Sequence, residues 1–260
     1  MTRTLATTDQ IAAAKLAGAV IPPKSWDVVI YSQGKVVASW YDARGRKQCA
    51  YSSEAVADRN RRKFAEMVEF GASLPNIRKA VASDLHSANQ TARACAAIVA
   101  IMDQTTMRVG GAEYAAENGT YGASSLLKSH VSIDGETVRF SFTGKHHKSH
   151  DKSVSGAALV EAIEFFVATE GDKLFPVTET AVRAYLSAFG ATPKQFRTYH
   201  ASRVCSELLD AAGPAADAKA AKANINRAVK QVSELLGNTP AMARNSYIDP
   251  TILAAYAAGM

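Results

Sequence analysis

The sequence has few of the features that mark secreted, membrane or metal-binding proteins. Its three cysteines, Cys49, Cys95 and Cys205, lie far apart among 260 residues and form no C-x-x-C pair. This spacing argues against a disulfide framework and a cysteine-bound zinc, and it indicates reduced thiols. No stretch reaches the ~18 apolar residues of a membrane span, and the N-terminus lacks the apolar segment of a signal peptide. The sequence therefore predicts a cytoplasmic protein with no membrane association.

Acidic residues are outnumbered by basic ones, 24 to 30, which gives a net charge of +6 and a pI near 9.2. From Lys24 to Lys79 there are eleven Lys or Arg and six Asp or Glu residues, a net charge of +5. A basic balance of this kind favours a polyanionic partner such as nucleic acid. Hydrophobic residues make up 47% of the chain, enough for the core of one large domain or two modest ones.

The pattern of apolar residues predicts an α+β protein. An alanine-rich helix over 8–20 precedes two strands, 26–31 and 35–41, which form a hairpin. From about residue 55 the apolar spacing becomes helical. Later helices are expected at about 155–169, 179–188, 200–211 and 222–236, after a β-hairpin with an Asp134-Gly135 turn and a strand at 137–143. We expect a small β-containing DNA-binding part, 1–56, and a mostly α-helical catalytic domain, 57–260, that carries the β-hairpin.

One tyrosine near the C-terminus has an unusual setting. Tyr247 lies in LLGNTPAMARNSYIDP, among small and polar residues with no apolar neighbours to pack on. It is either a surface or lid residue, or a nucleophile. Three cations are placed where elements begin or end: Arg108 follows an apolar helix, Lys145 sits at a hairpin tip and Arg197 opens a helix. Each alone is explained by solvent exposure, but nearby glycines such as Gly144 let backbone approach a ligand closely.

The order Arg, Lys, Arg, polar residue, Tyr is more specific than any of its members. With the segments IPPKSWDVVI, DARGRKQCAY, MRVGGAEYAAENGTYGASSLL, FTGKHHKSH, FRTYHAS and LLGNTPAMARNSYIDP, it resembles the type IB DNA topoisomerases of the poxvirus and bacterial group. The resemblance runs from about residue 21 to the end. Tyrosine recombinases share the catalytic fold but match less well, since their second arginine box reads H-x-x-R and this chain has Arg197-Thr-Tyr-His200.

The resemblance implies roles for five residues. Tyr247 would be the nucleophile, Arg108 and Arg197 the phosphate clamps, and Lys145 the general acid. Asn238 stands where poxvirus members have histidine, so the position is expected to need a hydrogen-bond donor, with a proton carrier optional. The chain also has about 20 residues before the I-P-P segment, where family members have several more strands, so we expect an incomplete N-terminal half of a DNA clamp. Either the chain is naturally short there, or it holds DNA with less surface.

The chemistry of a phosphodiester agrees with these roles. Arginine forms bidentate, permanently charged hydrogen bonds to phosphate oxygens. A lysine with a lowered pKa can protonate a leaving 5′-oxygen. A 3′-phosphotyrosyl ester conserves the energy of the broken bond, so neither cofactor nor metal is expected. Asn238 can donate to a non-bridging oxygen; alternatively it only caps the preceding helix.

Other residues are expected to contact double-stranded DNA: Arg44, Arg46, Lys47, Gln48, Tyr51, Lys148 and His200. The alternatives are a solvated basic hairpin edge for the first five and a packing or capping role for His200. The HHKSH segment (146–150) could pass for a metal cluster, but beside a basic site it favours phosphate contacts. The Gly110-Gly111 pair and GTYG lack the strand-to-helix context of a nucleotide-binding loop. Only about 13 residues follow Tyr247, which favours a monomer. A tyrosine recombinase and a DNA-binding module with little cleavage remain alternatives.

Overall fold

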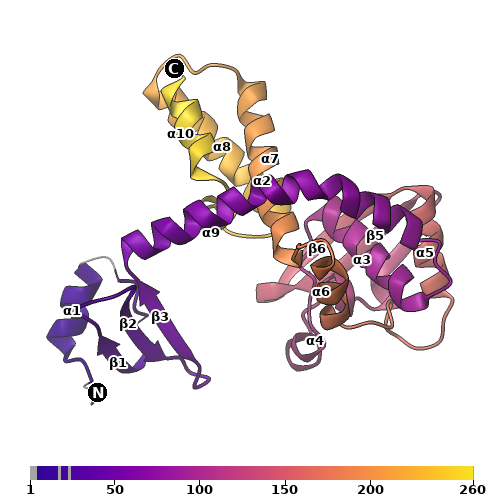
Figure 1. Ribbon diagram of the computed structural model, residues 1–260, viewed down its shortest axis with the longest axis horizontal. Coiled ribbons are helices and arrows are strands. Elements are labelled where there is room, and N and C mark those ends of the chain that lie inside the picture. The colour runs from indigo at the N-terminus through magenta and orange to yellow at the C-terminus, as the bar shows by residue number, and fades with distance from the viewer. Residues whose placement is uncertain (1–4, 17–18, 23–24, 260) are drawn as a thin grey trace. The chain divides into compact units, whose positions relative to one another are not determined.

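A computed structural model describes residues 5–16, 19–22 and 25–259 (Figure 1). The chain divides into two compact units, Met1–Glu66 and Met67–Met260. Helix α2 (Ser53–Asp84) begins in the first and ends in the second. The expected α+β class is confirmed: the structure is mostly helical with small antiparallel sheets. No helix in the described ranges is long and apolar enough to cross a bilayer.

The first unit is a three-stranded antiparallel sheet with one flanking helix. Its elements are α1 (Thr8–Leu16), β1 (Trp26–Ile30), β2 (Val36–Tyr41) and β3 (Lys47–Tyr51). A small core gathers Ile21, Val28, Ala38 and Trp40. The two expected strands are confirmed, whereas β3 was not predicted, because this edge strand has no buried residue to mark it. The expected helix over 8–20 is shorter, and residues 17 and 18 lie outside the described ranges.

The second unit combines helices with a second antiparallel sheet. Its helices after α2 are α3 (Gln90–Thr105), α4 (Ala112–Asn118), α5 (Ala157–Val167), α6 (Glu179–Ser187), α7 (Pro193–Ala212), α8 (Ala218–Leu236), α9 (Pro240–Ser246) and α10 (Pro250–Ala258). Helix α3 is the centre of the packing, since it contacts α5, α6, α7 and the sheet. Its Asn89 side chain accepts hydrogen bonds from two backbone amides of the first turn, and most of its length is buried.

The sheet of the second unit contains β4 (Val131–Asp134), β5 (Thr137–Gly144) and β6 (Lys148–Ser155). The expected turn is present, with Gly135 in a left-handed conformation. Val138, Phe140 and Phe142 alternate into the core as predicted. The third strand was not predicted: most of the HHKSH segment belongs to β6 or to the short turn of helix before it (Lys145–His147), because strand pairing with β5 can order a polar segment.

The C-terminal helices α7, α8, α9 and α10 share one apolar cluster, and α7, α8 and α10 lie together in Figure 1. Helix α7 begins at Pro193, seven residues before the expected start, with a Thr192–Gln195 capping box. Arg197 therefore lies inside the helix instead of opening it. The predicted domain boundary at 56/57 stays a prediction; it falls within α2.

Candidate active site

The loop after α3 holds Arg108 in place, because two stretches of its backbone cross in close contact at Gly110 and Gly122. Helix α3 ends in the left-handed residue Thr106, and the chain then passes Gly110 and Gly122. A Cβ on Gly122 would lie 2.6 Å from the Arg108 carbonyl oxygen and 2.6 Å from backbone atoms of Gly110. The Ala123 amide donates to that carbonyl at 2.9 Å. The backbone of Arg108 is thus held on both sides, at a contact that only glycine permits.

Arg197 enters the site from α7 and is almost fully buried, at 4% exposure. Its guanidinium donates to the Thr106 carbonyl and, at 2.9 Å, to the Leu236 carbonyl at the end of α8. Burial, followed by repulsion from Arg108, lowers the pKa of Arg197 to about 10. The group therefore stays charged at neutral pH, with neutral carbonyls as its hydrogen-bond acceptors.

Asn238 lies in the turn that closes α8. The amides of Gly237 and Asn238 donate to the carbonyls of Glu234 (3.1 Å) and Ser233 (2.9 Å), which is a Schellman motif with Gly237 in the left-handed region. The backbone of Asn238 thus caps the helix, as the alternative interpretation expected. Its side chain does something else: Oδ1 accepts a 2.7 Å hydrogen bond from Arg108.

Two donors in this group have no acceptor. Among the described residues, Nδ2 of Asn238 and Nε of Arg197 are buried and without a hydrogen-bond partner. Buried N–H groups are seldom left unpaired in native proteins, because each costs ~1–3 kcal/mol of desolvation. Their presence beside two arginines indicates a place for an acceptor with several oxygens, such as a phosphate.

Tyr247 ends α9 and is half-buried. The expectation that it has no apolar neighbours was wrong, since it packs against the cluster shared by α7, α8 and α10. Ser202 of α7 fixes its backbone, donating to the Tyr247 carbonyl at 3.2 Å and accepting from the Asp249 amide at 3.0 Å. Helix α7 therefore positions both the tyrosine and Arg197.

The phenol of Tyr247 lies against cationic groups. The guanidinium carbon of Arg197 is 5.2 Å from the ring centroid. Burial alone would raise the pKa of Tyr247, but the charge and hydrogen bonding of Arg197, with the charges of Arg108 and Lys194, outweigh it and lower the pKa below its ordinary value. This environment favours the phenolate, which is the nucleophilic form of the side chain.

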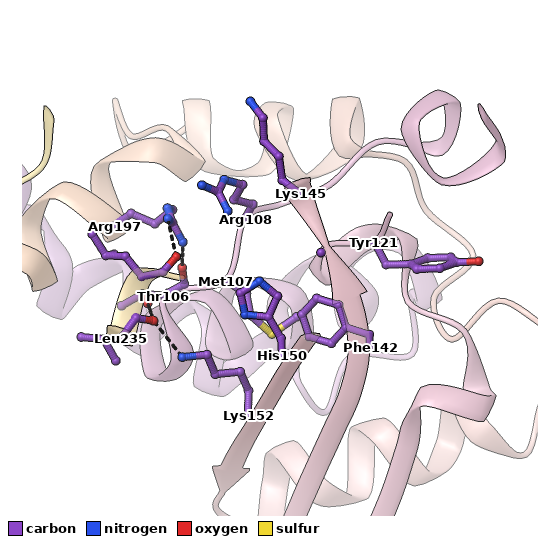
Figure 2. Close-up of a pocket in the computed structure, with 12 residues that line it drawn as sticks. Thr106, Met107, Arg108, Tyr121, Phe142, Lys145, His150, Lys152, Arg197 and Leu235 are labelled. Atoms are coloured by element: carbon purple, nitrogen blue, oxygen red, sulfur yellow. Dashed lines mark hydrogen bonds between the residues drawn. The ribbon is translucent and has the colours of Figure 1, made fainter. Parts of the chain in front are cut away.

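Lys145 and the sheet complete the site. A cavity of about 20 Å³, the space of one water molecule, is lined by Arg108, Lys145, Arg197 and residues of β5, β6 and α8 (Figure 2). Lys145 directly follows β5 at the exposed tip, and Figure 2 shows its side chain extended away from the cavity. Deeper in, Lys152 donates to the Leu235 carbonyl at 2.8 Å.

The five residues expected to carry the chemistry come from different elements of one unit. Four of them, Arg108, Arg197, Asn238 and Tyr247, are joined by the hydrogen bonds and charge contacts given above. Lys145 lines the same cavity as both arginines. Three neighbours in this group were not predicted, Lys152, Lys194 and Ser202, and His150 was considered only as part of the HHKSH segment. His150 and Lys152 point to one face of β6 by its two-residue period, a signal that needs the strand to be known first.

The residues expected to contact DNA outside this group have varied surroundings. Asp42 accepts hydrogen bonds from the side chains of Arg46 (2.9 Å) and Gln48 (3.1 Å). The Arg46 hydrogen bonds lower the pKa of Asp42 to about 2. Arg44 and Lys47 are exposed in the same hairpin, and the guanidinium of Arg59 lies 5.3 Å from the exposed Tyr51 ring. DNA contacts by these residues stay predictions.

Two further DNA-contact candidates lie in the second unit. Lys148 begins β6 opposite Gly144, and it contributes to the positive field at His150. His200 is buried, at 4% exposure, and its Nε2 lies 2.7 Å from Asp103 Oδ1. The structure thus gives His200 a hydrogen-bond partner within the protein, and its contact with DNA stays a prediction.

Comparison with known proteins places the chain in a family. Residues 52–256 match the family model described as eukaryotic DNA topoisomerase I, catalytic core. DNA topoisomerase 1B of Acanthamoeba polyphaga mimivirus is 27% identical over 231 residues, which cover 80% of this chain and 68% of the relative. DNA topoisomerase 1B of vaccinia virus (strain Copenhagen) is 23% identical over 245 residues, 90% of this chain and 78% of the relative. Among solved structures, the XerH site-specific recombinase bound to difH substrate is 13% identical with a TM-score of 0.44, over 70% of this chain and 52% of that one.

Proposed function

Because the chain belongs to the DNA topoisomerase I family, we propose that it relaxes supercoiled double-stranded DNA as a type IB enzyme. In this proposal it cleaves one strand through a 3′-phosphotyrosyl bond, lets the free 5′-hydroxyl end rotate, and reseals the strand. The viral topoisomerase relatives support this reading of the site.

The first step is attack by the Tyr247 oxygen on a backbone phosphorus. The Tyr247 phenol gives its proton to water, the O–P bond forms, and the bond to the 5′-oxygen breaks. Arg108 and Arg197 hold the non-bridging oxygens, where negative charge gathers in the transition state. The lowered pKa of Tyr247 supports its role as the nucleophile.

The second half of the step is departure of the 5′-oxygen. An alkoxide leaves poorly, so a proton must reach it, and Lys145 is the cation at the exposed tip beside the arginines. Resealing reverses these transfers: the 5′-hydroxyl attacks the phosphotyrosine and tyrosine leaves. The ester stores the energy of the broken bond, so the proposed cycle uses neither ATP nor a metal ion.

The observation that carries the proposal is the pair of unpaired donors. Nε of Arg197 and Nδ2 of Asn238 are buried without acceptors among the described residues, in the group that contains Tyr247. A phosphodiester would supply acceptors to both. On this reading Asn238 donates to a non-bridging oxygen, and its Oδ1 keeps Arg108 in place.

Partners and organisation follow from the same proposal. The partner is duplex DNA, held by the basic N-terminal part of residues 1–56 and by the catalytic domain of residues 57–260, and the active form is a monomer. The position of Arg44, Arg46 and Lys47 in an exposed hairpin supports phosphate contacts there.

A plasmid assay tests the function directly. Supercoiled plasmid is incubated with the protein in EDTA and without ATP, and we expect a ladder of relaxed topoisomers. Site-restricted recombination would favour a recombinase, and a gel shift without relaxation would favour a binding module. Tyr247→Phe should abolish relaxation and the covalent adduct seen on a denaturing gel, while DNA binding stays nearly intact. Tyr256→Phe, a change nine residues away, serves as control; an adduct formed by Tyr247→Phe would remove Tyr247 as nucleophile.

A further inference from the structure

His150 lies between the two turns that carry Lys145 and Asn238. A Cβ on Gly144, the residue before Lys145, would be 2.5 Å from His150 Cδ2. A Cβ on Gly237, the residue before Asn238, would be 2.3 Å from His150 Cε1. Both distances are far inside van der Waals contact, so the imidazole occupies a slot that exists because both neighbours are glycine.

The slot is closed on its other sides. The imidazole stacks on Phe142, its cross-strand partner, with centroids 5.2 Å apart and planes inclined by 20° (Figure 2). Two residues farther along β6, Lys152 donates to the Leu235 carbonyl near the end of α8. His150 and Lys152 thus join one strand of the sheet to the C-terminus of α8, one by packing and one by a hydrogen bond.

The imidazole acts here as a neutral spacer. Burial, followed by repulsion from Lys152, Arg108, Arg197 and Lys148, lowers the pKa of His150 to about 4. The side chain is therefore uncharged at neutral pH, and it is not a proton donor for the reaction. A flat neutral group fills the slot without adding a further cation to the group.

Lys145 has little else to fix its position. Its side chain is exposed and, within the described residues, has no hydrogen-bond or ion-pair partner. The two residues that follow it, His146 and His147, have φ angles of 65° and 53°, so the chain turns sharply right after the lysine. The direction of Lys145 is then set by the backbone of Gly144, which rests on His150.

We propose that His150 is a positioning residue for strand cleavage: its imidazole spaces the Gly144–Lys145 backbone from the Gly237–Asn238 turn and so aims Lys145 at the leaving 5′-oxygen. This proposal rests on the proposed function. It adds a residue that touches no substrate atom and works through the placement of the proton donor.

Single-turnover cleavage of two DNA substrates tests the proposal, one with the natural 5′-oxygen and one with sulfur at that bridging position. We expect His150→Ala to slow cleavage of the oxygen substrate by about 10-fold to 10²-fold, since a misplacement of ~1 Å at a reacting group costs up to 10²-fold. On the sulfur substrate the loss should shrink to within about threefold, because a thiolate leaves without a proton. Rate constants, unlike amplitudes, do not depend on the folded fraction.

A double-mutant cycle tests the slot itself. Gly144 has φ −102°, which alanine tolerates, so Gly144→Ala acts through the clash with His150. We expect it to slow cleavage at least tenfold in the wild-type background and to be nearly silent beside His150→Ala, where the methyl group has room. His86→Ala, at an exposed histidine of the same unit, is the matched control and should cleave at the wild-type rate.

The outcomes distinguish a failure of the positioning role of His150 from a failure of the proposed function. If Lys145→Ala is rescued by sulfur and His150→Ala is not, the proposed function stands and the positioning role is overturned. Additive effects of Gly144→Ala and His150→Ala also overturn it. If Lys145→Ala is not rescued, the proton-donor role of Lys145 fails and the positioning role fails with it.

Discussion

Arg46 of the first unit and the two site arginines of the second unit, Arg108 and Arg197, are paired in opposite ways. In the first unit, Arg46 forms an ion pair with Asp42 at 2.8 Å, and its side chain remains 58% exposed. In the second unit, Arg108 and Arg197 donate to uncharged oxygens, those of an asparagine amide and two backbone carbonyls, and Arg197 also hydrogen-bonds the Tyr247 phenol. Within the described ranges neither has an ion pair with a carboxylate. Arg197 is almost fully buried and would gain most from a counter-ion, yet it has none among the described residues.

This difference in pairing indicates a different role for the exposed arginine and for the two site arginines. A carboxylate beside Arg197 would neutralise the field that lowers the pKa of Tyr247 and would compete with a phosphate. An exposed arginine can keep its carboxylate, because solvent and salt screen the pair and a phosphate can displace it. The end of α8 replaces a counter-ion for Arg197, since helix C-terminal carbonyls carry partial negative charge.

The largest expected effect separates these two sets. Arg197→Ala should slow single-turnover cleavage on the order of 10²–10³-fold, as loss of a preorganised oxyanion donor does. The loss should persist on the sulfur substrate, because Arg197 acts on non-bridging oxygens; Arg108→Ala should behave alike. Arg46→Ala should cleave at the wild-type rate once DNA is saturating. Rescue of Arg197→Ala by sulfur, or equal slowing by Arg46→Ala, would show that the two sets of arginines do not have separate roles.

The next effect concerns Asn238. Asn238→Ala should slow cleavage on the order of 10²-fold through loss of one donor to the phosphate. Asn238→His should keep substantial activity, since imidazole can donate there, and Asn238→Asp should be worse than Ala, because a carboxylate repels the phosphate and offers no donor at neutral pH. Melting temperatures are measured alongside. An Ala variant that melts early yet cleaves at the wild-type rate would leave Asn238 only its capping role.

The sequence allowed prediction of the five site residues because each stands in a distinctive short segment, such as FTGKHHKSH for Lys145. Its family resemblance covers nearly the whole chain, and apolar periodicity places α2, α3, α5, α6 and α8 well. Strands β3 and β6 escaped prediction because they are polar, and their order comes from pairing with a neighbouring strand. The start of α7 was misplaced although Thr192, Pro193 and Gln195 carry a capping signal.

Other features could not be seen in the sequence at all. The apolar surroundings of Tyr247 are a cluster that α7, α8, α9 and α10 build together, so most of its members lie far from Tyr247 in the sequence. Nε of Arg197 and Nδ2 of Asn238 are unpaired because, among the described residues, no acceptor from another segment reaches them in the fold. The slot around His150 depends on Gly144 and Gly237, two glycines that come to flank one imidazole only after folding. Such features depend on contacts between distant segments, which no local pattern encodes.

A smaller effect tests whether Arg108 depends on its glycine crossing. Gly122→Ala would place a methyl group 2.6 Å from the Arg108 carbonyl oxygen, so the loop must shift. We expect a stability loss of ~1–3 kcal/mol, typical of overpacking, and about tenfold slower cleavage, part of the ~10²-fold that a 1 Å misplacement costs.

The control for this change is Gly119→Ala in the same loop region. Gly119 is left-handed, with φ 58°, and a Cβ there would meet no atom within 4 Å. Its substitution should cost ~1–2 kcal/mol of backbone strain and leave the cleavage rate constant unchanged. If the two variants cleave alike, the crossing of Gly110 and Gly122 does not position Arg108.

The exposed basic hairpin of the first unit is expected to affect DNA binding and not the cleavage rate. Arg46→Ala and Lys47→Ala should each weaken DNA binding and lower the slope of log affinity against log salt by roughly one unit.

Asp42→Asn should act oppositely. The side-chain amide oxygen of this variant would still accept from the backbone amides of residues 44 and 46, which Asp42 Oδ1 binds at 3.0 Å, but the side chain would no longer neutralise the Arg46 charge. We expect higher affinity and a steeper slope, by at most about one unit. Asp58→Asn makes the same charge change next to Arg61 and controls for net charge. Equal gains from both aspartate variants would show that only overall charge matters, whereas unchanged affinity and slope in the Arg46, Lys47 and Asp42 variants would remove this hairpin from the DNA interface.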